Sequence, residues 1–220
     1  MKVYFISGIG ADHRFFIHTR LPKGYEAVYL DYIPHQQKES LPAYARRLAE
    51  KIDPSVPFAL VGLSLGGIMA TEIAKIKQPD FTILIASVPL SSHLPRYYSF
   101  AKRLGLHRMM PGAFFKVLAA IKHIFSFKTW SDKRLILAVI WEGDSKFINW
   151  AVNAVLEWNN AILPPNLYHI HGTRDEVFPI SLTRPTHRIE KGGHLLVMSK
   201  ADRVSAIIQE ILSPYDKQIS

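Results

Sequence analysis

Residues 58–67 read FALVGLSLGG, and this stretch decides the fold. The apolar run over 58–61 predicts a buried strand, and Gly62 and Gly66 bracket Ser64 in a G-x-S-x-G pattern. In a sharp strand-to-helix turn, the residues two before and two after the serine must be small, and both are glycine here. The pattern predicts that Ser64 stands at the carboxyl edge of a sheet, beside helix N–H groups that favour negative charge.

Short apolar runs alternate with helical patterns on both sides of this stretch. We expect six strands, at residues 3–6, 27–30, 58–61, 81–86, 167–171 and 186–189. Helices are expected after Ser40, over residues 65–77 and at the C-terminal end, where Ser199 is the expected N-cap. Strands that alternate with helices predict an α/β fold, in which helices cover both faces of a mostly parallel sheet.

Residues 88–160 interrupt this alternation, because their pattern is helical throughout. Apolar side chains recur at helical spacing from Phe114 to Phe125, for example. The total length suits one domain of fair size. We therefore expect a single domain over residues 1–220, with 88–160 as a helical lid inserted above the sheet.

The composition is that of an ordinary globular protein. Of the 220 residues, 48% are hydrophobic and 20% are charged. The chain has no cysteine, which excludes disulfides, thiolate metal ligands and a cysteine nucleophile. It shows neither a signal-peptide pattern nor an uncharged apolar stretch of the roughly 18 residues that suggest a membrane-spanning helix. We expect a cytoplasmic protein without a transmembrane segment.

The net charge of +9 is unevenly distributed. Residues 81–131 contain seven Lys and Arg residues and no Asp or Glu. A solvated helical surface is one interpretation, and a surface that attracts an anionic substrate, a phosphate-bearing carrier or a membrane is the other. The basic residues form no compact run of the kind found in nucleic-acid-binding arms, so we expect no nucleic-acid partner.

A serine nucleophile needs a base, and ten histidines are available. His194 ends the sequence KGGH, which follows the last predicted strand, so it is expected at the same edge of the sheet as Ser64. His169 and His171 fall inside the preceding strand instead. His194 is therefore the candidate base.

The base in turn needs an acid that orients it. Asp175 lies in HGTRDEVFP (171–179), directly after the fifth predicted strand, and Glu176 is the adjacent alternative. The loop after the fourth strand, residues 87–92, contains no carboxylate and offers no competing position. Asp175 is therefore the candidate acid.

The loop after the first strand, SGIG at residues 7–10, places two glycines one residue apart. A dinucleotide-binding loop is one interpretation, with Asp31 as the ribose-binding acid. However, His13 occupies the third glycine position of G-x-G-x-x-G, where a helix and a strand must pack closely. This argues against a dinucleotide cradle, while the loop still suits backbone N–H groups that face an anion.

Ser64, Asp175 and His194 follow one another in the chain order of the α/β-hydrolase fold superfamily, which this sequence resembles. The matching pieces are SGIG, GLSLGG, HGTRDEVFP and KGGH. The resemblance is closest to small single-domain serine esterases with a helical lid, which use no metal and no cofactor. The usual N-terminal antiparallel hairpin is missing, so the resemblance implies a reduced sheet of about six strands.

By the same resemblance, the N–H groups of Ile9 and Leu65 would form the oxyanion hole. Such a donor matters because removing one typically costs about 3–4 kcal/mol of barrier. The family usually has His-Gly-x-Gly in the first loop, and Ser7 replaces that histidine here.

The expected function is hydrolysis of a small carboxylic ester or thioester with an apolar acyl group, through an acyl-enzyme on Ser64. A cofactor-free lyase or C–C hydrolase on the same triad, and a ligand-binding pseudo-hydrolase, are the alternatives. Phe114, Phe125 and Trp150 are the candidate lining of the acyl pocket, and plain helix packing is the other role open to each. The basic lid would attract an anionic substrate or a membrane surface.

Overall fold

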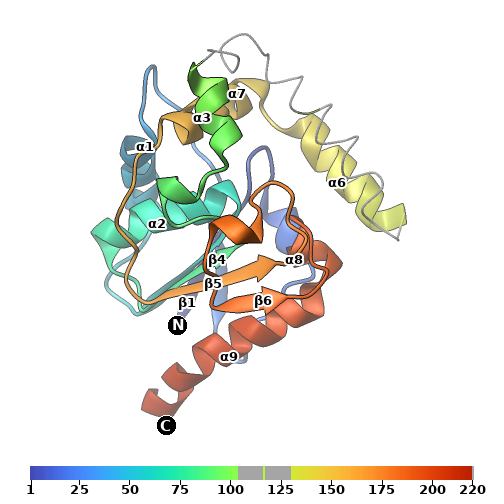
Figure 1. The fold of residues 1–220 in the computed structure, drawn as a ribbon. Helices are drawn as coiled ribbons and strands as arrows, with labels where there is room; N and C mark the ends of the chain where they lie inside the picture. Colours follow the sequence, from blue (N-terminus) through green and yellow to red (C-terminus); the bar gives the residue numbers. More distant parts are fainter. Residues whose placement is uncertain (104–115, 117–129, 220) are drawn as a thin grey trace.

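The computed structural model describes residues 1–103, 116 and 130–219. Its centre is a sheet of six strands, all parallel, in the order β2-β1-β3-β4-β5-β6 (Figure 1). The strands are β1 (Lys2–Ile6), β2 (Glu26–Tyr29), β3 (Phe58–Leu63), β4 (Phe81–Ile85), β5 (Leu167–Gly172) and β6 (His187–Ile189). The predicted parallel sheet of six strands is confirmed.

Seven described helices and four short 3-10 turns connect the strands. The helices are α1 (Leu41–Leu48), α2 (Leu65–Lys77), α3 (Arg96–Arg103), α6 (Trp130–Glu142), α7 (Ser145–Glu157), α8 (Leu196–Ser199) and α9 (Ala201–Ile219). The 3-10 turns are η1 (His13–Phe16), η2 (Ala49–Lys51), η3 (Ser91–His93) and η4 (Ile180–Leu182).

Strands β1, β3 and β4 are buried on both faces, whereas the edge strand β2 is largely exposed. Successive side chains of a strand point to opposite sides. On β1, Val3 and Phe5 belong to one core, which α9 completes, whereas Tyr4 and Ile6 belong to the other, which α1 and α2 complete. Figure 1 shows α9 on one side of the sheet and α1 with α2 on the other. Two helical layers therefore hold the sheet rigidly, and its carboxyl edge can carry a site.

Of the two serines predicted as helix N-caps, Ser40 is confirmed and Ser199 is not. Ser40 caps α1, since its Oγ accepts a hydrogen bond from the N–H of Ala43 at 3.4 Å. The prediction that Ser199 caps the last helix is wrong: Ser199 ends α8, and its hydroxyl donates to the carbonyl of Leu195 at 3.2 Å. The short helix α8 takes up residues directly before the expected helix, so α9 begins only at Ala201.

Helices α3, α6 and α7 lie between β4 and β5 in the sequence and above the carboxyl edge of the sheet (Figure 1). Residues 104–115 and 117–129 of the predicted lid lie outside the described residues. That 88–160 acts as a lid on a single domain stays a prediction.

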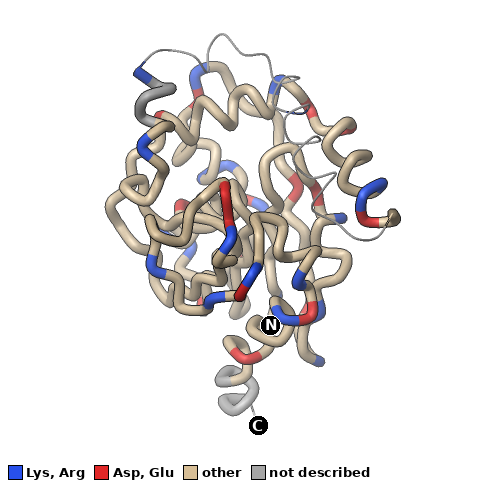
Figure 2. Tube along the Cα trace, turned by 45° about the vertical axis from the view of Figure 1, so that its right-hand side comes forward, with Lys and Arg blue, Asp and Glu red and all other residues tan. Residues whose placement is uncertain are grey.

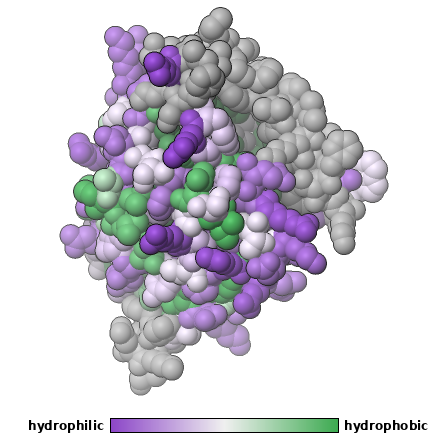
Figure 3. Space-filling model, in the orientation of Figure 1, coloured by the Kyte–Doolittle hydropathy of each residue, from purple (hydrophilic) through white to green (hydrophobic). Residues whose placement is uncertain are grey.

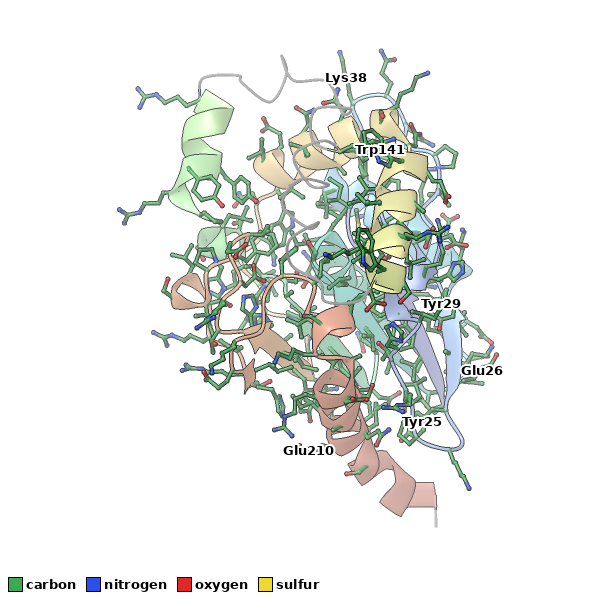
Figure 4. All side chains as sticks on the ribbon, turned by 90° about the vertical axis from the view of Figure 1, so that its right-hand side faces the viewer. Tyr25, Glu26, Tyr29, Lys38, Trp141 and Glu210 are labelled. Atoms are coloured by element: carbon green, nitrogen blue, oxygen red, sulfur yellow. The ribbon has the colours of Figure 1, made fainter. Side chains whose placement is uncertain are left out.

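The described surface carries both signs of charge. Lys and Arg residues are interspersed with Asp and Glu (Figure 2), and the face in Figure 3 is mainly hydrophilic, with hydrophobic residues in small separate patches. Glu26 and Tyr29 mark the edge strand β2, and Trp141 lies near the end of α6 (Figure 4). Among the described helices, none is long and apolar enough to span a bilayer.

Candidate active site

Ser64 occupies the turn between β3 and α2. Its backbone is left-handed, with φ 53° and ψ −117°, a conformation that residues with a side chain rarely adopt. A Cβ at position 62 would lie 2.3 Å from the Gly66 oxygen, and one at position 66 would lie 2.0 Å from the Ile6 oxygen. Because both distances are far below van der Waals contact, only glycine fits at either position, as the sequence pattern predicts.

His194 lies beside Ser64, on the loop after β6. Its Nε2 is 2.9 Å from Ser64 Oγ, and its Nδ1 is 2.9 Å from Asp175 Oδ2 and 3.1 Å from Oδ1. Since an ionised carboxylate can only accept, His194 carries its proton on Nδ1, and Nε2 accepts the hydroxyl proton of Ser64. The structure thus brings the three predicted residues into one hydrogen-bonded chain, each just beyond the end of a parallel strand.

The carboxylate of Asp175 is fully buried and held from several sides. Its Oδ1 accepts hydrogen bonds from the backbone N–H groups of Val177 at 2.9 Å and Phe178 at 3.0 Å. Burial alone would raise the pKa of Asp175, but the bonds from His194 and from the Phe178 N–H outweigh it and hold that pKa below its ordinary value. Asp175 is therefore ionised at neutral pH.

The loops that carry Asp175 and His194 are bonded to each other. Arg174 donates its N–H to the carbonyl of Gly192 at 2.8 Å, and Lys191 donates its N–H to Thr173 Oγ1 at 2.9 Å. A Cβ at position 172 would lie 2.2 Å from the Gly192 oxygen, so Gly172 allows this close approach. The two loops consequently hold the acid and the base in a fixed relation.

The loop after β1 forms a type II turn over residues 8–11. Ala11 donates its N–H to the carbonyl of Gly8 at 3.2 Å, and Gly10 has a φ of 64°, which the third position of such a turn requires. Ile9, at the second position, keeps its N–H outside the hydrogen bond that closes the turn.

This turn lies against Ser64. A Cβ at position 8 would be 3.6 Å from the Cβ of Ser64. Leu65 is the first residue of α2, so its N–H has no acceptor within the helix. The N–H groups of Ile9 and Leu65 are therefore available near the serine, and their use as an oxyanion hole stays a prediction.

Ser7, which replaces the usual histidine, closes the base of the loop. Its hydroxyl donates to the carbonyl of Asp12 at 2.8 Å, and its own carbonyl accepts a hydrogen bond from the Tyr32 hydroxyl at 2.6 Å. Asp12 then caps η1 by accepting the N–H of Arg14 at 2.9 Å. The loop is thus anchored by contacts that the sequence pattern did not indicate.

The same loop contacts the end of α6. Arg14 bonds the carboxylate of Asp12 through Nε and Nη2, at 3.0 and 2.6 Å, and its Nη2 also bonds Glu142. A Cβ at position 143 would lie 2.9 Å from the Gly10 oxygen, so the turn after α6 approaches the loop closely.

A cavity of about 580 Å³ opens beside the loop. Ser7 and Gly10 form one wall, the end of β2 a second, and the turn between α6 and α7 a third, and none of Ser64, Asp175 and His194 lines it. Aromatic side chains give it an apolar floor: Phe5, Phe16, Tyr29, Tyr32 and Phe147. Asp31, the acid of the dinucleotide hypothesis, also lines it.

Of the three residues predicted to line the acyl pocket, the structure describes only Trp150. Phe114 and Phe125 lie outside the described residues. Trp150 packs on Tyr44, with ring centroids 4.5 Å apart, and donates its Nε1–H to the carbonyl of Glu39 at 3.0 Å. These contacts explain Trp150 as part of the α1–α7 packing, and its place in an acyl pocket stays a prediction.

Sequence reasoning missed a pair of histidines behind the acid. His169 and His171 are both buried, and their Nε2 and Nδ1 atoms, respectively, are 3.0 Å apart. His171 Nε2 also lies 3.5 Å from Asp175 Oδ2. The signal was present: alternate residues of a strand point to the same side, and this strand ends directly before the loop of Asp175.

A metal centre in this chain would need a cluster of His, Asp or Glu side chains, since cysteine is missing. In residues 1–103, 116 and 130–219, no group of three or more such side chains is placed to hold a metal ion.

The comparisons with known proteins concern the family and the fold. Residues 3–207 match the family model of the alpha/beta hydrolase family, so the chain belongs to that family. No curated protein matches the sequence.

Solved structures share the fold over nearly the whole chain. An esterase from Thermogutta terrifontis with bound malate is 19% identical with a TM-score of 0.74, covering 97% of this chain and 90% of that one. A hydrolase from Pseudomonas aeruginosa PA01 is 14% identical with a TM-score of 0.75, at 96% and 89% coverage. A bromoperoxidase from Bacillus anthracis is 14% identical with a TM-score of 0.66, at 96% and 91% coverage. At these identities the likeness shows the fold.

Proposed function

We propose that this protein hydrolyses a small carboxylic ester or thioester with an apolar acyl group, and that Ser64, His194 and Asp175 are its catalytic triad. The observation that carries the proposal is the continuous chain from Ser64 Oγ through His194 to Asp175, with 2.9 Å at each of its two closest contacts. The fold is one that an esterase from Thermogutta terrifontis also has.

The first half of the reaction forms an acyl-enzyme. Ser64 Oγ attacks the carbonyl carbon of the ester while His194 Nε2 takes the hydroxyl proton. Asp175 stabilises the imidazolium that results and keeps its ring oriented. His194 then gives the proton to the departing alcohol or thiol, and the acyl group stays on Ser64.

The second half returns the enzyme to its starting state. A water molecule gives a proton to His194 Nε2 and attacks the acyl carbon, and the tetrahedral intermediate then collapses to the free acid while His194 returns the proton to Ser64 Oγ. In both halves the negative charge develops on the former carbonyl oxygen. The N–H groups of Ile9 and Leu65 are the donors that stabilise it, because both are backbone groups without an acceptor in their own turn or helix.

The decisive experiment compares wild type with Ser64→Ala on a panel of p-nitrophenyl esters, acyl thioesters and lactones. We expect hydrolysis of the preferred substrate to fall by about 10³-fold or more in the variant. Ser205→Ala is a matched control, since Ser205 is a buried serine on α9. Undiminished hydrolysis by Ser64→Ala would remove the serine from the mechanism.

A fluorophosphonate probe separates the alternatives. Labelling of wild type and not of Ser64→Ala, together with turnover of esters or thioesters, supports the hydrolase. Labelling without turnover on the whole panel points to a lyase or C–C hydrolase. Neither labelling nor turnover points to a ligand-binding pseudo-hydrolase.

A further inference from the structure

Two histidines that the proposed mechanism does not use are buried directly behind Asp175. His169 and His171 are 1% and 0% exposed, and both belong to β5. His169 Nε2 is 3.0 Å from His171 Nδ1, and His171 Nε2 is 2.8 Å from the carbonyl oxygen of Phe178. A buried polar pair of this kind is costly unless every group is bonded, so its bonding pattern is informative.

The contacts favour one arrangement of protons for the neutral pair, although His169 also has a hydrogen bond with the backbone of Ser87. His171 Nε2 faces only acceptors, the Phe178 carbonyl at 2.8 Å and Asp175 Oδ2 at 3.5 Å, so this nitrogen must carry a proton. His171 Nδ1 is then bare and must accept, which requires the proton of His169 on Nε2. Both rings are therefore Nε2–H tautomers: His169 donates to His171, and His171 donates to the Phe178 carbonyl, with Asp175 Oδ2 at 3.5 Å.

The acceptor of the His171 hydrogen bond, Phe178, belongs to the segment that also binds the Asp175 carboxylate. Phe178 receives the His171 hydrogen bond on its carbonyl and donates its own N–H to Asp175 Oδ1 at 3.0 Å. His171 therefore acts on Asp175 in two ways, through the N–H facing Oδ2 and through the backbone that binds Oδ1. His194 Nδ1 contacts both oxygens of the same carboxylate, at 2.9 Å to Oδ2 and 3.1 Å to Oδ1.

We propose that His171, held in its Nε2–H tautomer by His169, is a positioning residue that sets the plane and the ionisation of the Asp175 carboxylate for His194. The proposal rests on the function proposed above. The pair supplies this orientation as a neutral donor, so that no second cation competes with the His194 imidazolium for the carboxylate.

The electrostatics of the site agree with a neutral pair. Burial lowers the pKa of His169 to about 3, and burial also lowers the pKa of His171 against the opposing pull of Asp175. The titratable groups that face the two rings are Asp175, His194 and His93. Of these, only Asp175 favours a charge on the pair.

The mutational test uses two replacements of His171. Phenylalanine keeps a ring and removes the donor, whereas glutamine offers an N–H₂ group in place of Nε2–H. With the best ester of the panel, we expect kcat of His171→Phe to fall about ten- to a hundredfold, with KM changed less than about twofold. His171→Gln should recover most of the loss. Thr82→Val is the matched control, because it removes a buried hydrogen bond from the adjacent strand, at 3.1 Å to the Pro165 carbonyl.

A second measurement needs no variant and no substrate. Long-range ¹H–¹⁵N spectra of wild-type protein labelled at histidine report which ring nitrogen is protonated. We expect two histidines that stay neutral Nε2–H tautomers from pH 5 to pH 9, assigned to positions 169 and 171 by their loss in His169→Gln and His171→Gln. An Nδ1–H tautomer at 171, or titration of either ring in this range, would overturn the proposal.

The two proposals fail in different ways. If wild type hydrolyses esters and labels at Ser64 while His171→Phe keeps its kcat, the positioning role is wrong and the hydrolase stands. Loss of activity in His171→Gln as large as in His171→Phe, with Thr82→Val active, would also contradict it. If no substrate is turned over, the function proposal fails. The ¹H–¹⁵N spectra then still show which ring nitrogens of His169 and His171 carry a proton.

Discussion

Asp175 shows how a single residue depends on groups that are distant in sequence. Its carboxylate is bonded by His194 on one side and by the N–H groups of Val177 and Phe178 on another. Glu176, the alternative acid at the level of sequence, is exposed, while Asp175 is buried. Neighbouring loop residues point in different directions, and only the buried carboxylate can orient a base.

Replacing each carboxylate in turn should therefore show whether Asp175 or Glu176 orients His194. We expect Asp175→Asn to lower kcat by about 10⁴-fold, because the amide favours the wrong tautomer of His194. Glu176→Gln is the control, and its kcat should stay within a factor of about two. Initial-rate kinetics on the preferred ester measure both. The reverse result, with the large loss at position 176, would assign the acid to Glu176.

Among the elements, the loop after β1 lies in close contact with α7 and with the turn that follows α6. Gly10 has a left-handed φ, and a Cβ there would lie 2.9 Å from Ile148 Cδ1 on α7. The same glycine faces Gly143, which follows α6. A side chain at position 10 would therefore disturb both the turn that presents Ile9 and its contact with the helices above.

Gly10→Ala tests this dependence, and Gly24→Ala is a close control. Gly24 has φ +86°, and a Cβ added there would have nothing within 4 Å, so both variants carry the strain of a left-handed alanine, about 1–2 kcal/mol. We expect both to unfold at lower temperature, and only Gly10→Ala to lose kcat, by about 10²-fold as the Ile9 donor moves. Thermal melts and ester kinetics give the two readouts. Equal kcat in the two variants would contradict a role for the Ile9 N–H.

Across the whole molecule, buried histidines connect folding stability to pH. The pKa of His169 is lowered from 6.5 to about 3 by burial, so the unfolded chain binds this proton more readily than the folded protein does. The free energy of unfolding then falls as the pH drops from 6.5 toward 3, by up to about 1.4 kcal/mol per pH unit for one such group. Asp175 adds a loss only below its unfolded pKa of 3.8, because its folded pKa is lowered.

His169→Gln removes the titrating ring and keeps a donor for His171. We expect the variant to be less stable than wild type at pH 7 and to lose less further stability between pH 6.5 and pH 4.5. Urea unfolding at several pH values measures the slope. Parallel slopes in the two proteins would mean that His169 is not the group responsible.

The fold and the three candidate catalytic residues followed from sequence because their signals are local. Strands alternate with helices, Gly62 and Gly66 permit one kind of turn, and Asp175 and His194 come directly after strands, whose carboxyl ends meet at one edge. The predicted family and fold are confirmed. The rest depends on how the loops and short helices are arranged around these residues.

Three cases show the physical reason. The bond of Ser7 to the Asp12 carbonyl requires the loop to be closed already. The His169–His171 pair looks like ordinary strand sequence until the loop of Asp175 folds over it. Ser199 resembles a cap because a serine before a helical pattern usually is one, and an added short helix displaces the start of α9.

The left-handed backbone of Ser64 sets a limit on how far this protein can be stabilised. Strain of this kind is worth about 1–3 kcal/mol, and glycine would relieve much of it. We expect Ser64→Gly to melt at a higher temperature than Ser64→Ala, which keeps the strained backbone without the hydroxyl. Selection for heat resistance alone would therefore favour discarding the nucleophile, and a screen for thermostable variants of this chain should score activity alongside melting temperature.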